Sequence, residues 1–265
     1  MKNLRVLFLG DLVGSPALRA LFTGLAQLVR DTSADIVAVN GENLADGFGL
    51  TPEHVEKLFA MGVSVITSGN HIWQRDELIP SLESEKYLLR PDNFPSGVPG
   101  HGSAVLEISG TSIGFLNLQG QERMGRTVDC PFRAAKKAVS ALRKKTKNII
   151  VDFHAEDVRE KEALFNQLDG RVSAVLGTHT HVPTRDERIL PGGTAVITDL
   201  GMCGPEGSVI GTKPGLSIRR SLTQLPIRME VHDNHAALQG VLLEIDTKTG
   251  KALGISRIRR VPEAS

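Results

Sequence analysis

The chain has 265 residues, which is enough for one large domain with a sizeable buried core, and we expect a single domain over 1–265. Its 31 basic side chains nearly balance its 30 acidic ones, and a formal net charge of +1 argues against a protein that coats nucleic acid or an anionic membrane. Nine Phe, one Trp and one Tyr are too few for the stacking platforms of single-strand-binding proteins, and two cysteines exclude a disulfide scaffold and a four-cysteine zinc site.

Neither a membrane span nor a secretory leader is expected from the hydropathy pattern. The first apolar run, Val6 to Leu9, is short and is followed at once by Gly10 and Asp11. Nowhere do about 18 apolar residues follow one another. We therefore expect a cytoplasmic protein in which Cys130 and Cys203 are free thiols without a catalytic role.

The first part of the chain alternates apolar runs with helical patterns. The predicted strands are 5–9, 36–39 and 63–66. Ser15 as N-cap with Pro16 begins the helix between the first two, and Thr51 with Pro52 begins the next by the same chemistry. This alternation predicts a parallel sheet covered by helices.

Antiparallel pieces follow the parallel ones. The loop 93–102 is rich in Pro and Gly, and Ser109-Gly110 marks a hairpin turn. The remaining predicted strands are 104–108, 112–118, 148–153, 172–176, 195–197, 227–231, 236–245 and 252–258, and the remaining helices are 131–145 and 160–168. The pattern predicts an α/β fold in which two mixed sheets pack together with helices outside, a four-layer αββα sandwich.

Five of the apolar runs end in side chains that can bind metal. These endings are Asp11; Asn40, Glu42 and Asn43; Asn70 and His71; His154; and His179 and His181. Ligands collect beyond the carboxyl ends of the strands in open α/β sheets, so parallel strands would bring these residues to one edge. His179 and His181 alternate along an extended segment and should therefore point the same way.

The residue types indicate the kind of metal. Carboxylate, carboxamide and imidazole without thiolate suit iron, manganese or zinc, whereas calcium prefers oxygen ligands alone. The candidates outnumber the three or four protein ligands of one zinc ion. Two metal ions that share a bridging carboxylate are therefore expected, and such a pair clamps the attacking and leaving oxygens of a displacement at phosphorus.

In this order, these motifs resemble those of the calcineurin-like metallophosphoesterases. They are most similar to the YmdB-type branch, bacterial 2′,3′-cyclic-nucleotide phosphodiesterases with the metallophosphoesterase-like fold. The motifs are Gly10-Asp11, the Asn-Gly-Glu-Asn run 40–43, Gly69-Asn70-His71, His154 and the Gly-Thr-His-Thr-His run 177–181. Agreement extends to the runs 117–120, 129–132 and 198–205, and so over nearly the whole chain, to about Asp246.

The resemblance implies a role for each residue. Asp11, Glu42, Asn43 and His181 would hold one metal ion, and Glu42, as the bridge, would hold the other together with Asn70, His154 and His179. His71 would not be a ligand but the proton donor to the leaving ribose oxygen, and a metal-bound hydroxide would be the nucleophile. We expect iron, with manganese or zinc as alternatives, and a small cyclic nucleotide as substrate.

Two departures from the wider superfamily favour the YmdB-type branch. The first motif usually reads Asp-x-His, but Val13 stands at its third position here. The wider group usually bridges with Asp, where this chain has Glu42. The metal preference of better-known phosphatases therefore does not transfer.

Three alternatives remain. A phosphomonoesterase or a nuclease would use the same site, because pocket shape sets specificity. A non-enzymatic regulator would bind RNA or protein through the basic stretch Arg133 to Lys147. A helix that buries Ala134, Ala138, Val139 and Leu142 and exposes its charges explains that stretch better, so RNA is not the favoured partner. We expect a homo-oligomer, since closed dimers are common.

Two loops and four histidines lie outside the metal-binding motifs. The loop around Phe48 needs no role in phosphate binding. The polar loop Asn117 to Arg126 is a candidate lining of the substrate pocket, through Gln119, Gln121 and Arg123. No role is assigned to His54, His101, His232 and His235.

Overall fold

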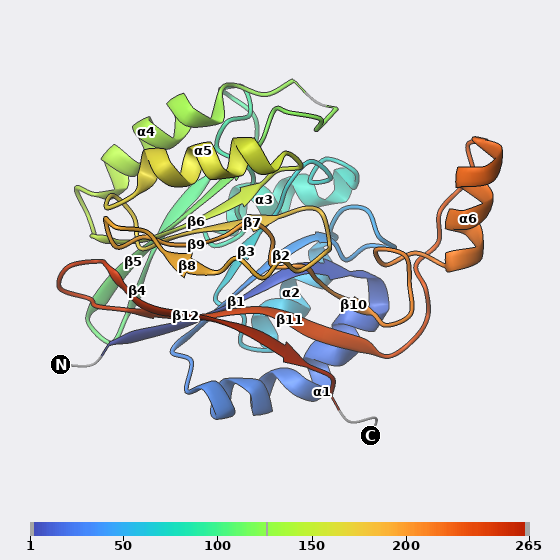
Figure 1. The fold of residues 1–265 in the computed structure, drawn as a ribbon, viewed down its shortest axis with the longest axis horizontal. Helices are drawn as coiled ribbons and strands as arrows, with labels where there is room; N and C mark the ends of the chain where they lie inside the picture. Colours follow the sequence, from blue (N-terminus) through green and yellow to red (C-terminus); the bar gives the residue numbers. More distant parts are fainter. Residues whose placement is uncertain (1–2, 126, 263–265) are drawn as a thin grey trace.

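The computed structural model describes residues 3–125 and 127–262, and in this part of the chain the strands form two packed six-stranded sheets (Figure 1). The first sheet contains, in spatial order, β12 (Ala252–Arg260), β11 (Ala236–Ile245), β10 (Met202–Pro205), β1 (Leu4–Val13), β2 (Ile36–Asn43) and β3 (Val65–Thr67). The second contains β4 (Ser103–Ile108), β5 (Thr111–Gln119), β6 (Asn148–His154), β7 (Ala174–Thr178), β9 (Ala195–Ile197) and β8 (Arg188–Ile189). In the first sheet β10, β1, β2 and β3 run parallel, β11 runs antiparallel to them, and β12 runs antiparallel to β11. In the second sheet the four central strands are parallel and the edge strands β4 and β8 antiparallel, so both sheets are mixed, as predicted.

Helices cover the outer faces of both sheets. Figure 1 shows α1 (Gly14–Thr32) and α2 (Pro52–Ala60) on the first sheet, and α4 (Pro131–Leu142) and α5 (Val158–Leu168) on the second. A 3₁₀ turn at Asp76–Leu78 and the short α3 (Ile79–Ser84) follow β3, and α6 (Pro214–Thr223) stands away from the sheets. The expected four-layer sandwich is confirmed. None of the helices described here has the length and hydropathy needed to cross a membrane.

Three apolar clusters lie between these four layers. Successive side chains of β1 point to opposite faces, so Leu7 and Leu9 pack under α1 while Val6 and Phe8 pack between the sheets. The third cluster lies between the second sheet and α4 with α5. Burial on both faces explains why the central strands read as continuous apolar runs.

The predicted helix starts differ in outcome. Thr51 caps α2 as predicted, since its side chain accepts a hydrogen bond from the backbone N–H of His54. Ser15 is not the cap of α1, which begins at Gly14 after Val13 and has no side-chain cap. Gly14 has a φ of +63°, and Val231 lies where its Cβ would be. A contact with a distant segment therefore sets this helix start.

The hairpin and the basic helix agree with the sequence pattern. Ser109 and Gly110 have φ angles of 48° and 78°, as a type I′ turn between antiparallel β4 and β5 requires. Helix α4 ends at Leu142, earlier than the predicted Lys145, and buries Ala135, Ala138, Val139 and Leu142. The basic side chains lie on its other face, as a solvated helix requires.

The predicted strand 227–231 is wrong. In the structure this segment is an extended loop after α6, and only Val231 makes a bridge, to Thr212. The side chains of Ile227, Met229 and Val231 alternate as in a strand but line two cavities instead of a sheet face.

Candidate metal centre

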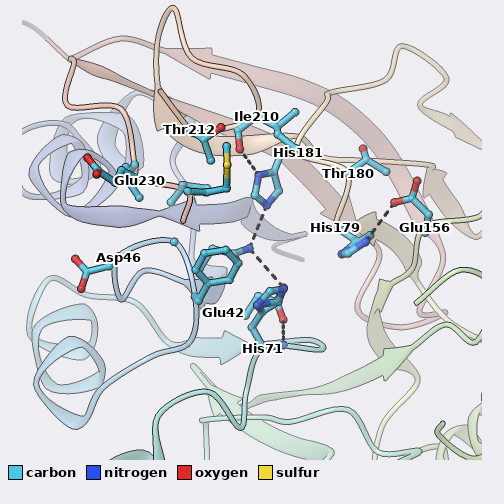
Figure 2. A pocket seen from close by; sticks show the side chains of 16 residues that line it. Glu42, Asp46, His71, Glu156, His179, Thr180, His181, Ile210, Thr212 and Glu230 are labelled. Atoms are coloured by element: carbon cyan, nitrogen blue, oxygen red, sulfur yellow. Dashed lines mark hydrogen bonds and ion pairs between the residues drawn. The ribbon is translucent and has the colours of Figure 1, made fainter. Parts of the chain in front are cut away.

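The predicted site residues lie together where the carboxyl ends of parallel strands from both sheets meet. Asp11, Glu42, Asn43, Asn70 and His71 come from β1, β2 and the turn after β3 in the first sheet. The second sheet supplies His154 at the end of β6 and His179 and His181 after β7. All eight predicted site residues therefore lie around one point, and Figure 2 shows part of this group around a cavity.

Strand β1 changes one of its neighbouring strands at Asp11. Its first half pairs antiparallel with β11 up to Leu9, and Asp11 then pairs parallel with Met202 of β10. The register with β2 shifts at the same place. Gly10 permits this close approach, because a Cβ there would lie 1.9 Å from the carbonyl oxygen of Gly201. The irregularity points the buried Asp11 carboxylate toward the site.

One group of ligand atoms forms around the Nε2 atom of His154. Glu42 Oε1 lies 2.9 Å from it, Asn70 Oδ1 3.1 Å and His179 Nδ1 3.0 Å. The ligand atoms of Glu42, His154 and His179 all lie within 4.8 Å of one another and could hold a metal ion. This is the set predicted for one of the two ions.

A second group forms around the amide of Asn43. Its Nδ2 atom lies 3.1 Å from His181 Nε2 and 3.4 Å from both Asp11 Oδ1 and Glu42 Oε1. A half-turn of the amide presents its oxygen to the same point. The structure thus also brings the other predicted set together, with Glu42 shared by both.

Each of the three imidazoles is held from outside the centre. His154 Nδ1 donates to Thr178 Oγ1 at 2.8 Å, and Thr178 donates to the buried Asp152 carboxylate at 2.7 Å. His181 Nδ1 donates to the carbonyl of Ile210 at 2.9 Å, and His179 Nε2 lies 3.2 Å from Glu156. The other nitrogen of each ring faces inward, which is the arrangement that metal-binding histidines have. The donor set therefore fits divalent metal ions.

Burial and pairing shift the pKa values of the inner groups. Burial raises the pKa of Asp11 to about 6. For Glu42 burial is outweighed by the charge of His154 and its hydrogen bond, so its pKa falls to about 2, and the same pair raises the pKa of His154 to about 9 against the effect of burial. Burial and the charge of His154 lower the pKa of His179 to about 3. Glu42 and His154 thus favour a carboxylate–imidazolium pair, and a cation that binds there competes with the proton of His154.

The segment that carries His179 and His181 is not extended, contrary to the prediction. Strand β7 ends at Thr178, and both histidines have positive φ angles, 108° and 66°. Non-glycine residues rarely adopt this conformation, and they keep it only where the surroundings enforce it. Here the Asp199 carboxylate accepts the backbone N–H of Thr180 at 3.0 Å.

His71 lies beside the two groups of ligand atoms. Its backbone N–H donates to Glu42 Oε2 at 3.0 Å, and its ring lies 5.0 Å from the ring of Phe48. Together with Glu42, Asn43, His179 and His181, the side chain lines a cavity of about 330 Å³ (Figure 2). An imidazole next to the ligand sets can reach a molecule bound to them.

Several lining residues were not predicted. Phe48, Glu156 and the segments around Ile210 and Met229 line the cavity. Gln119, Gln121 and Arg123 are absent from its lining among the described residues, and Arg126 lies outside those residues. Only Glu156 could have been found from the sequence, because it lies two residues after the predicted ligand His154. The others come from loops that the fold brings together.

Known proteins match this chain over almost its whole length. A family model described as "YmdB-like protein" matches residues 7–258. The 2′,3′-cyclic-nucleotide 2′-phosphodiesterase of Bacillus subtilis is 42% identical over 255 residues, which are 96% of each chain. The crystal structure of a phosphatase from Mycoplasma pneumoniae is 39% identical, with a TM-score of 0.93 over 98% of this chain and 94% of that one. The NAD nucleotidase of Haemophilus influenzae, 15% identical with a TM-score of 0.64, matches 98% of this chain and 56% of its own and shares the fold alone.

Proposed function

This chain belongs to the YmdB-like family, and we propose that it is a metal-dependent phosphodiesterase that opens 2′,3′-cyclic nucleotides. The observation that carries the proposal is the pair of ligand groups that share Glu42 beside a cavity of about 330 Å³. The relative from Bacillus subtilis, whose name states this activity, supports the choice of substrate.

Two metal ions are proposed, iron first, with manganese or zinc as alternatives. Asp11, Glu42, Asn43 and His181 would hold one ion, and Glu42, Asn70, His154 and His179 the other. When bound, the ions supply Lewis-acid chemistry, which lowers the pKa of a water molecule and neutralises charge on the phosphate.

His71 is the proposed proton donor. Water adds to phosphorus and the P–O bond to the ribose 2′ oxygen breaks, so this oxygen needs a proton to leave as a hydroxyl group. The imidazole of His71 lies at the cavity wall beside the ligand groups, where it can reach the leaving oxygen of a bound substrate. The product is then a nucleoside 3′-phosphate.

A substrate panel on one metal-loaded preparation tests the proposal. It compares 2′,3′-cyclic AMP with 3′,5′-cyclic AMP, p-nitrophenyl phosphate and an RNA without a cyclic end. We expect the highest kcat/KM for 2′,3′-cyclic AMP, with 3′-AMP as product. Faster hydrolysis of p-nitrophenyl phosphate would make the chain a phosphomonoesterase, cleavage of the plain RNA would make it a nuclease, and no turnover of any substrate would favour a non-enzymatic regulator.

A further inference from the structure

A second cavity adjoins the proposed substrate cavity. It has a volume of about 850 Å³ and shares part of its wall with the smaller one, namely Asp46, Phe48, Met229, Glu230 and Val231. We infer that this second cavity binds the phosphodiester backbone of RNA, so that the substrate is an RNA chain with a 2′,3′-cyclic phosphate at its 3′ end. The inference rests on the proposed function and names its substrate class.

The charges of the second cavity favour an anion. Its three acidic side chains are each paired with a cation: Glu230 with Lys213 at 2.6 Å, Asp233 with Arg19 at 2.5 Å and Asp46 with Arg75 at 3.4 Å. Two further arginines line it, Arg220 and Arg228. Among the described residues neither guanidinium group has an ion pair within 4 Å, although the charge of Arg228 contributes, after Lys213, to lowering the pKa of Glu230.

The two arginines can contact a bound chain. Arg220 lies near the end of α6, Arg228 lies in the loop that follows, and both are exposed. Guanidinium groups bind phosphate oxygens through paired, charge-assisted hydrogen bonds. Because these contacts involve the backbone, they carry no base preference.

The direction of the chain fits the order of the cavities. In an RNA that ends in a cyclic phosphate, the terminal nucleotide continues only through its 5′ oxygen. With the cyclic phosphate at the metal centre, the preceding phosphodiester can extend past the shared wall into the second cavity. Phe48 is 43% exposed on that wall and offers a ring face to a base. The chain has too few aromatic residues to stack several successive bases, but stacking one base requires only one ring.

The volumes of the two cavities also favour an RNA chain as the substrate. A volume of about 330 Å³ lies near the lower limit of small-molecule sites, as one nucleotide requires. The adjoining 850 Å³ is more than a free cyclic mononucleotide needs. A longer chain would fill both.

The test compares three substrates on the metal-loaded protein. They are 2′,3′-cyclic AMP, the same nucleotide with a 5′-phosphate, and a trinucleotide that ends in the cyclic phosphate. We expect kcat/KM for the trinucleotide to exceed that of 2′,3′-cyclic AMP by about tenfold or more, as one or more charge-assisted hydrogen bonds predict. The preference should also weaken as salt concentration rises.

Charge reversal locates the contact. The relevant ratio is kcat/KM for the trinucleotide divided by kcat/KM for 2′,3′-cyclic AMP. In Arg228→Glu and in Arg220→Glu this ratio should fall about tenfold, and it should depend less on salt concentration. Arg133→Glu, a reversal at another exposed arginine, on α4, is the matched control and should keep the ratio. Loss of the ratio in Arg133→Glu but not in Arg228→Glu would overturn the inference.

The remaining outcomes separate the two proposals. If 2′,3′-cyclic AMP is hydrolysed but the trinucleotide is not preferred, only the RNA inference fails. If the 5′-phosphorylated mononucleotide matches the trinucleotide, the cavity takes a single phosphate group and the RNA inference is again wrong. If neither cyclic mononucleotide nor trinucleotide is hydrolysed, the proposed function itself fails.

Discussion

The ammonium group of Lys161 lies 3.0 Å from the carboxylate of Asp199, and both side chains are almost completely buried. The same carboxylate accepts the backbone N–H groups of Thr180 and Gly201, at 3.0 Å and 2.8 Å. Thr180 lies between His179 and His181, the two residues with positive φ. This buried ion pair therefore holds the backbone that presents both imidazoles to the candidate centre.

Lys161→Met should destabilise the protein and disturb the centre. It leaves the Asp199 charge buried without its cation, which costs about 3–5 kcal/mol in comparable pairs. Urea unfolding should show the loss, and metal analysis should find less bound ion per chain. Lys136→Met, on the exposed face of α4, is the control. Equal stability and equal metal content in both variants would contradict this role.

Gly69→Ala should abolish metal binding while the fold remains. A Cβ at this position would lie 2.1 Å from His154 Cδ2 and 2.4 Å from Glu42 Oε2, so both side chains would have to move. We expect a loss of affinity of more than about a hundredfold, since loss of a residue that only orients a ligand already costs about 10–100-fold. Isothermal titration calorimetry measures this, and circular dichroism checks the fold. Gly215→Ala in α6, where a Cβ meets nothing within 4 Å, should bind metal normally.

Glu156→Ala tests the outer contact of His179. The carboxylate lies 3.2 Å from His179 Nε2 and orients the ring so that Nδ1 faces inward. Removal of such a partner should weaken metal binding about 10–100-fold. Glu156→Gln, which keeps an oxygen that can accept the bond, should lose less. Equal affinity in Glu156→Ala and the unaltered protein would show that His179 is positioned without this contact.

The variant His71→Asn tests whether His71 is a proton donor or a metal ligand. Loss of general acid catalysis should lower kcat on 2′,3′-cyclic AMP by about 10²–10⁴-fold. The loss should be much smaller on bis(p-nitrophenyl) phosphate, because nitrophenolate leaves without a proton. Metal content should stay unchanged. If metal is lost, His71 is a ligand, and if both substrates slow equally, it is not the proton donor.

Metal binding should release protons, and its affinity should rise with pH. His154, with a pKa of about 9, is protonated at neutral pH in the ion-free centre and must lose this proton to bind metal. Below about pH 6 Asp11 must lose a proton as well. The logarithm of the binding constant should therefore rise by at least about one per pH unit between about 6 and 9, and more steeply below. Calorimetry at pH 7.5 in buffers of different ionisation enthalpy counts the protons, and a count of zero would contradict the pairing of His154 with Glu42.

The sequence predicted the inner residues because they share one simple rule. Asp11, Glu42, Asn70, His154 and His179 all follow apolar runs, and the runs became parallel strands whose ends meet. Strand identity and direction were sufficient to place these residues at one edge, although the conformation of the segment 179–181 was predicted wrongly. This is why the structure brings together all eight predicted site residues.

The outer residues follow no such rule. Lys161 lies in mid-helix and Asp199 in a loop, so only the packed fold brings the two side chains together. The segment 227–231 misled the prediction because Ile227, Met229 and Val231 alternate as in a strand. The three side chains line a cavity, and Val231 also packs against Gly14. Periodicity does not distinguish such contacts from those of a sheet.

The division of the site between two sheets has a consequence for folding. Glu42 belongs to the first sheet and His154 to the second, and the contacts that join them link residues far apart in the sequence. Such long-range contacts form slowly, and neither sheet alone presents a complete set of ligands. A metal ion therefore has little to bind until the chain is almost native, so it slows unfolding much more than it speeds folding.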